Sequence, residues 1–409
     1  MNNIQKQFID ILSAGIRGIS AEKCYENVDW DEVLELANKH KVEGILYLGL
    51  RKGNLSSRIG ENRLNMLKKK AAITGIGQSR HISGLSEVLS KINEIKIPVI
   101  VLKGLVVRDF YPQPDQRSMS DADILVHKDD VEAVKKILID MGYVFLEDHK
   151  ASHHIALVHH KYPVVEIHWH LFKRDGFSDE LESYESLIWE HAIDVNVGQA
   201  SVLSLAYDDL ALHLCMHMAA HLAATGFGVR QLCDLVLLVE KKGHEIDWNS
   251  FIMKSKIYGF EKFNLIMFLL CKELFNMEVP QDINIKSVSN KKYVEALIDE
   301  IFESGVHGKK EMVNQFSTQV AFNFEGKDEN ATWGAIKRYL KFIFPSIDSM
   351  SDSYSYAKNF KILAPIAWIH HLFAGIFSKQ YSFRDKFDFL TKGPSIAINR
   401  NKLLDWMEL

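Results

Sequence analysis

The stretch RSMSDADILVHKDD, residues 117–130, decides the fold because it places two carboxylates at the start of an apolar strand. Residues two apart in a strand point to the same face, so Asp121 and Asp123 would lie side by side before Ile-Leu-Val. Like charges at that separation repel and raise one another's pKa unless a cation separates them. The spacing alone leaves two interpretations open, a metal site or a polar turn that precedes a buried strand.

Short apolar runs on both sides of this stretch predict a compact sheet. The runs at 155–160 and 164–172 are separated by Lys161-Tyr162-Pro163, which is typical of a hairpin. Residues 97–172 are therefore expected to form a strand-rich block. The expected strands are IPVIVL (97–102), DADILVH (121–127), YVFLE (143–147), IALVHH (155–160) and VVEIHWHLF (164–172).

Helical patterns flank this block, which predicts an α+β fold: a small mixed sheet with helices before it and a mostly helical C-terminal part. Asp29 is the expected N-cap of the first clear amphipathic helix, and Gly142 is the expected end of a helix that begins near residue 131. The expected regions are an N-terminal helical region at 1–95, a core at 96–200 and a helical C-terminal region at 201–409.

The bulk composition excludes several classes of protein. The chain has 409 residues, 49 basic against 53 acidic side chains and a net charge of −4, so long nucleic acid is not an expected partner. Its four cysteines form no CxxC pair and indicate reduced thiols and a cytoplasmic location. No secretory signal is recognised. The apolar run Ile362–Phe377 is shorter than the ~20 residues of a membrane span, so a buried or interfacial helix is expected there.

A third carboxylate, Glu166, lies in the last expected strand. Strand alternation puts Glu166, His168 and His170 on one face, and a glutamate between Val165 and Ile167 is costly unless it is paired or binds a cation. Carboxylates from two strands could hold one or two hard cations such as Mg²⁺. The alternative is an ion pair with one of three nearby basic residues, Lys161, Lys173 or Arg174.

The turn after the first expected strand suggests a phosphate site. Gly104 lets a ligand approach the backbone closely, and the helix that it opens would direct N–H groups at an anion. Lys103 would add a positive charge. The alternative is an ordinary strand-to-helix turn with a solvated lysine.

Together these features resemble the nucleotidyltransferase superfamily, whose core is similar to DNA polymerase β. The shared layout is a strand, a small-residue turn, a helix, Asp-x-Asp on a second strand and an acidic residue on a later one. Within it, the chain looks like a poorly characterised bacterial family with a Leu-Lys-Gly turn. The resemblance covers nearly the whole chain, including IPVIVLKG (97–104), YPQPDQRSMSDADILV (111–126), VEIHWHL (165–171), LALHLCMHMAAHL (210–222), RQLCDLVLL (230–238), YLKFIFPSIDSMSDSY (339–354) and LAPIAWIHHLF (363–373).

The resemblance implies a transfer of a nucleoside monophosphate from an NTP, such as ATP, to an unidentified hydroxyl acceptor, with release of pyrophosphate. Asp121, Asp123 and Glu166 match the residues that hold two Mg²⁺ ions, with Mn²⁺ as an alternative, and Gly104 matches the phosphate-binding turn. The chain lacks the usual serine after that glycine, and its interval from Gly104 to Asp121 is longer than usual. Lys103 and Arg117 are the candidates for the missing phosphate contacts. The absent serine also leaves a catalytically silent nucleotide- or partner-binding module as an alternative.

The remaining candidates are histidines and a charged pair. His213, His217 and His221 recur every four residues, a spacing that suits either a zinc site, as in a hydrolase, or a packed helix. Arg230 and Asp234, also four apart, would form an ion pair or lie in the cleft. The histidine pairs at 153–154 and 159–160 are expected to be exposed. His168, His217, Arg230 and Asp234 are therefore the candidate cleft residues.

Overall fold

The computed structural model describes the chain apart from residues 147–153, 172–178, 307–335, 338–339, 342 and 378–381. The chain folds into two compact units. Unit 1 comprises Met1–His217 and Val229–Ser289, and unit 2 comprises Met218–Gly228 and Asn290–Leu409. The three regions expected from the sequence remain a prediction of domain boundaries.

Unit 1 is built on one mixed sheet of seven strands, which confirms the α+β fold class. The strand order is β3-β4-β5-β2-β1-β7-β6. The β5–β2 and β1–β7 pairs are parallel and the other pairs are antiparallel. The strands are β1 (Ile100–Val101), β2 (Asp121–Leu125), β3 (Val144–Leu146), β4 (His154–Val158), β5 (Val164–His168), β6 (Ile193–Val197) and β7 (Ala200–Ser204).

The strand-rich block extends beyond its expected end at residue 172. β6 and β7 form a hairpin that adds to the sheet through β1, so the expected end of the strands at residue 172 was wrong. A two-residue Gly198-Gln199 connection joins them, and Gly198 has a positive φ of 60°. Such a turn between β-branched residues is a hairpin signal that the sequence carried. The predicted β4–β5 hairpin is confirmed.

The register between β2 and β5 sorts polar and apolar side chains onto opposite faces. The strands run parallel, with Asp123 beside Glu166 and Leu125 beside His168. Side chains from alternate positions, Ala122, Ile124, Val165 and Ile167, are fully buried. The apolar alternation of both strands therefore brings carboxylates of different strands together on the other face.

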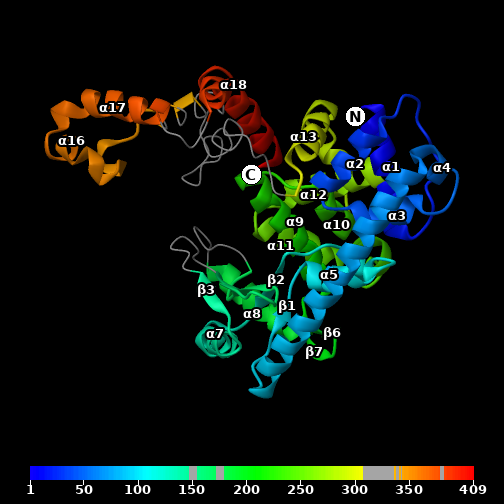
Figure 1. Ribbon diagram of the computed structural model, residues 1–409. Helices are drawn as coiled ribbons and strands as arrows, with labels where there is room; N and C mark the ends of the chain where they lie inside the picture. Colours follow the sequence, from blue (N-terminus) through cyan, green and yellow to red (C-terminus); the bar gives the residue numbers. More distant parts are fainter. Residues whose placement is uncertain (147–153, 172–178, 307–335, 338–339, 342, 378–381) are drawn as a thin grey trace. The chain divides into compact units, whose positions relative to one another are not determined.

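The N-terminal helices of unit 1 pack together, and the last of them reaches the sheet. Asp29 caps α2 by accepting hydrogen bonds from the N–H groups of Asp31 and Glu32, as predicted. The long helix α5 lies along β6 and β7 (Figure 1). These helices are α1 (Asn3–Arg17), α2 (Trp30–Lys39), α3 (Glu43–Leu50), α4 (Leu55–Ile59) and α5 (Glu61–Glu94).

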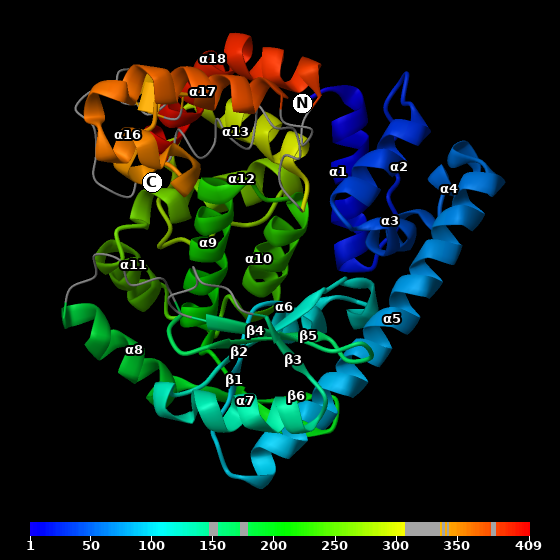
Figure 2. The ribbon, with the colours of Figure 1, turned by 60° about the vertical axis from the view of Figure 1, so that its left-hand side comes forward.

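Further helices of unit 1 cover the sheet, with α10 and α7 on opposite sides of it (Figure 2). α6 connects β1 to the loop before β2 and contacts both β2 and α10. Gly142, with a φ of 94°, follows the end of α7, as predicted. These helices are α6 (Gly104–Val107), α7 (Val131–Asp140), α8 (Asp179–His191), α9 (Tyr207–Ala224, which continues into unit 2), α10 (Val229–Lys242), α11 (Trp248–Ile257) and α12 (Glu261–Phe275).

Short 3-10 turns complete unit 1. η1 follows α6 directly, η2 belongs to the loop before β2, and η3 leads into α7. They are η1 (Arg108–Phe110), η2 (Pro114–Gln116), η3 (Lys128–Asp130) and η4 (Ile285–Val288).

Unit 2 is helical in its described part. Arg400 pairs with Glu300 and donates to the carbonyl of Leu222, which ties α18 to α13 and the end of α9. Trp368 is half-buried and donates to the carbonyl of Pro345 at 2.9 Å, whereas several apolar residues of α17 are exposed. No helix of the described chain could cross a membrane. The elements are α13 (Lys291–Ser304), η5 (Ile347–Ser349), η6 (Asp352–Tyr354), α16 (Ser355–Asn359), η7 (Lys361–Leu363), α17 (Ala364–Phe377) and α18 (Phe383–Met407).

Candidate active site

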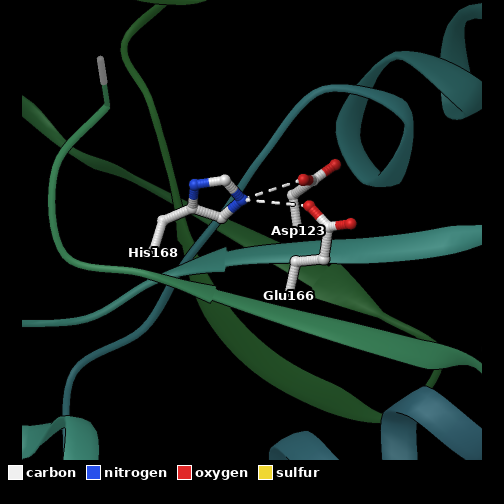
Figure 3. A group of neighbouring side chains, drawn as sticks. All are labelled: Asp123, Glu166 and His168. Carbon is white, nitrogen blue, oxygen red and sulfur yellow. Dashed lines mark hydrogen bonds and ion pairs between the residues drawn. The ribbon is translucent and has the colours of Figure 1, made fainter. Parts of the chain in front are cut away.

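A cluster of Asp123, Glu166 and His168 lies on the polar face of β2 and β5 (Figure 3). Nε2 of His168 lies 3.0 Å from Oδ1 of Asp123 and 3.6 Å from Oε2 of Glu166. One ligand atom from each residue lies within 4.8 Å of those of the others. The Asp123 and His168 side chains are buried, while that of Glu166 keeps 27% of its surface exposed. The cluster could hold a metal ion and still be reached by a substrate.

Lys103 is a second basic residue, in addition to His168, that contacts Asp123. Its Nζ lies 3.1 Å from Oδ1 of Asp123, the same oxygen that His168 approaches. Burial opposes ionisation, yet the charges of Lys103 and His168 hold the pKa of Asp123 well below its usual range. Burial also disfavours the imidazolium, but hydrogen bonds to Asp123 and Glu166 raise the pKa of His168. Asp123 is therefore a carboxylate held between the ammonium of Lys103 and the imidazole of His168.

Asp121 borders the cluster, and no cation among the described residues forms an ion pair with it. It points to the same face as Asp123, and its Oδ1 accepts a hydrogen bond from Ser120 at 3.2 Å. Burial, followed by the negative charges of Asp123 and Glu166, raises the pKa of Asp121, and Lys103 offsets this only in part. In the described chain, the group close enough to share an ion contains His168 in addition to Asp123 and Glu166, but not Asp121.

The turn from β1 into α6 brings Lys103 to the cluster through an unusual backbone conformation. Lys103 has φ 49° and ψ −119°, a region that side chains with a Cβ rarely adopt. Leu102 donates its N–H to the carbonyl of Asp123 at 3.1 Å, so the turn is tied to β2. A Cβ built at Gly104 would collide with the guanidinium of Arg117. This position therefore requires glycine for packing, whether or not a phosphate binds there.

Arg117 lies in a buried ion pair and not in the carboxylate cluster. It donates to both carboxylate oxygens of Asp234, at 3.2 and 2.6 Å, and Tyr111 donates to the same carboxylate at 2.7 Å. Although burial opposes it, Asp234 raises the pKa of Arg117 above its ordinary value. Of the two alternatives for Arg230 and Asp234, the structure does not favour the ion pair, since Asp234 pairs with Arg117 in the described chain. A phosphate-binding role for Arg117 stays a prediction.

The loop that carries Arg117 is held from three directions before it enters β2. Gln78 of α5 exchanges two hydrogen bonds with the backbone of Met119, at 3.1 and 2.9 Å. The hydroxyl of Ser118 donates to the carbonyl of Lys41 at 2.9 Å. Arg230 of α10 donates to the carbonyl and the hydroxyl of Ser118, at 2.8 and 3.0 Å. These contacts position Asp121 at the start of its strand, and no sequence pattern pointed to Gln78.

Further histidines lie near the cluster. His154 of β4 is half-buried and stacks on His168 with ring centroids 5.0 Å apart, so the expectation that it is exposed was wrong. Its cross-strand pairing with His168 explains the contact. His213 is buried, which lowers its pKa to about 3. Its ring stacks on that of His217, whose charge helps to lower the pKa of Asp123.

Other residues that were expected near Glu166 have different contacts. His170 lies 2.7 Å from Glu185 and thus pairs away from Glu166. Of the basic residues proposed to neutralise Glu166, Lys173 and Arg174 lie outside the described residues. Lys161 lies over the ring of Tyr162. Among the described residues, the group that could share a metal ion is Asp123, Glu166 and His168, and a zinc site on His213 and His217 stays a prediction.

Comparisons with known proteins identify a family for this chain. A family described as uncharacterised nucleotidyltransferase matches residues 26–276, which include both strands of the cluster and α10. Among solved structures, the antibiotic-resistance factor ANT(2'')-Ia is 8% identical, with a TM-score of 0.34. The alignment covers 45% of this chain and 96% of that one. No curated protein matches.

Proposed function

Because the chain belongs to this family of uncharacterised nucleotidyltransferases, we propose that it is a metal-dependent enzyme that transfers a nucleoside monophosphate from an NTP to a hydroxyl acceptor. Pyrophosphate is the second product. The proposal extends to a polymerase β-like core, a bacterial source and a cytoplasmic location. The observation that carries it is the parallel register of β2 and β5, which places Asp123 beside Glu166 two residues after Asp121.

The residues present fit a divalent cation. Asp121, Asp123 and Glu166 offer carboxylate oxygens on one face, and oxygen ligands suit Mg²⁺ and Mn²⁺. Lys103 and His168 balance part of this negative charge, but the pKa of Asp121 stays raised by its neighbours. A divalent ion would relieve that repulsion. We propose two Mg²⁺ ions held by the three carboxylates, with Mn²⁺ as a substitute.

When bound, such ions would polarise the acceptor hydroxyl and neutralise charge on the phosphates. The chain's own residues would supply position and proton transfer. Glu166, whose side chain is more exposed than those of Asp123 and His168, is suited to accept the proton of the attacking hydroxyl. Lys103, whose Nζ lies beside Asp123, would donate to a phosphate oxygen of the bound nucleotide. His168 would keep Asp123 oriented.

Calorimetric titration of ATP, CTP, GTP and UTP, with and without Mg²⁺, tests the site. The proposal predicts binding of at least one NTP that depends on Mg²⁺. Asp121→Asn, Asp123→Asn and Glu166→Gln should each remove the Mg²⁺-dependent part of the binding.

Asp31→Asn is the matched control, because it neutralises an exposed carboxylate whose partner is Arg63. It should bind NTP like the unaltered protein. Binding that is unchanged in all three site variants would refute the proposed role of these carboxylates. Binding without turnover would favour the silent module instead.

A further inference from the structure

Two arginines meet at the loop before β2, and only one of them is neutralised. Arg117 and Arg230 both donate to the carbonyl of Ser118, at 3.4 and 2.8 Å. Arg117 also has Asp234 as a bidentate partner, with side chains that are 8% and 2% exposed. Asp234 is further engaged by Tyr111. This carboxylate is therefore committed to Arg117.

Arg230 has no acidic partner among the residues that the structure describes. Its contacts are with Ser118, through one terminal nitrogen, and its Nε has no hydrogen-bond partner in the described chain. Burial and the nearby charge of Arg117 together lower the pKa of Arg230 to about 10. A partly buried guanidinium that no described carboxylate contacts is costly, and the charges of Asp234 and Asp121 offset this cost only in part, so the position favours an anionic ligand.

The position of Arg230 indicates what kind of ligand this would be. Its contact residue, Ser118, lies three positions before Asp121. The side chain of Arg230 keeps partial exposure, unlike that of Arg117. A guanidinium presents a fork of N–H donors that matches the oxygens of a phosphate.

We propose that Arg230 binds the phosphates that leave as pyrophosphate, while Arg117, Asp234 and Tyr111 form the buried framework that positions it. The inference rests on the proposed function and reassigns the phosphate contact expected of Arg117. Arg230 of α10 would hold the leaving group from one side, and the carboxylates of β2 and β5 would hold the metal ions.

Binding of inorganic pyrophosphate to the full-length protein, measured by calorimetry in the presence of Mg²⁺, tests this assignment. Arg230→Met should weaken pyrophosphate binding about 10- to 100-fold, the size expected for a lost charge-assisted hydrogen bond. Arg230→Lys, which keeps the charge, should retain part of the affinity. Arg63→Met, which removes an exposed positive charge paired with Asp31, should bind like the unaltered protein.

The melting temperature separates ligand binding from a structural role. Arg230→Met loses a charge that burial disfavours but also the two hydrogen bonds to Ser118, so its melting temperature should stay close to that of the unaltered protein. Affinity that is unchanged in Arg230→Met, or absent in the unaltered protein, would overturn the assignment. So would a loss of affinity that coincides with a lower melting temperature and is not rescued by lysine.

Failure of the inference differs from failure of the proposed function. Lost pyrophosphate binding in Arg230→Met, together with no nucleotidyl transfer by the unaltered protein, would support the anion site and refute the enzyme. Nucleotidyl transfer by the unaltered protein, with pyrophosphate binding intact in Arg230→Met, would support the enzyme and refute the anion site at Arg230.

Discussion

Lys103 combines an unfavourable backbone conformation with an ion pair to Asp123. Its φ of 49° and ψ of −119° suit glycine better than lysine, yet this conformation is what directs Nζ to the carboxylate. Strained residues of this kind are found at functional sites, where the surrounding structure maintains them. At this residue, the ion pair with Asp123 and the backbone conformation therefore have opposite effects on stability.

The strain predicts an inverted order of stability between two substitutions. Both Lys103→Gly and Lys103→Ala remove the ion pair, but only alanine keeps the Cβ that opposes this conformation. Lys103→Gly should therefore be more stable than Lys103→Ala by about 1 kcal/mol in chemical denaturation. Equal stability, or a more stable alanine variant, would show that the turn is not strained at this residue.

The turn between β1 and α6 is an element whose glycine has a packing role. In Gly104→Ala the new methyl group would meet the guanidinium of Arg117, which Asp234 holds in place. Overpacking of this kind should lower the free energy of unfolding by about 1–3 kcal/mol. Denaturant titration measures the change.

Gly77→Ala is the control for that measurement. Gly77 lies within α5, and a Cβ there meets no atom within 4 Å. Because alanine favours a helix, this variant should be stabilised by up to about 1 kcal/mol. A loss of stability of the same size in both variants would contradict the packing role of Gly104.

Short-range sequence patterns predicted the strands that carry the site better than the ion pairs between side chains around it. Period-two alternation was sufficient to place Glu166 and His168 on one face, because each strand buries its alternate residues. The partner of Arg117 lies 117 positions along the chain, on helix α10, so local spacing could not identify this pair. The contact of Lys103 with Asp123 depends on the backbone conformation of Lys103, with φ 49° and ψ −119°, which no composition rule predicts.

At the scale of unit 1, His40 links the N-terminal helices to the helix that carries Arg230. The N–H of Val229, the first residue of α10, donates to Nδ1 of His40 at 3.3 Å. Burial lowers the pKa of His40 to about 3. The neutral imidazole is therefore the form that the folded unit requires, and protonation would remove the acceptor.

This link predicts how stability depends on pH. Because the pKa of His40 is about 3 when folded and near 6.5 when unfolded, its contribution is complete above pH 6.5. It is lost at about 1.4 kcal/mol per pH unit as the pH falls from 6.5 towards 3. When the pH falls from 7.5 to 5, the free energy of unfolding should therefore decrease by about 2 kcal/mol less in His40→Gln than in the unaltered protein. Parallel pH profiles for the two proteins would contradict this.

At the scale of the whole molecule, the central question is whether the carboxylate face of β2 and β5 supports turnover. The most direct measurement is pyrophosphate release from each of the four NTPs with Mg²⁺, over a panel of small-molecule, sugar, protein and RNA acceptors. We predict release that requires both Mg²⁺ and an acceptor, and that is abolished by Asp123→Asn but retained by Asp31→Asn. Release that persists at the same rate in Asp123→Asn, or its absence from the unaltered protein with every NTP and acceptor, would contradict the account.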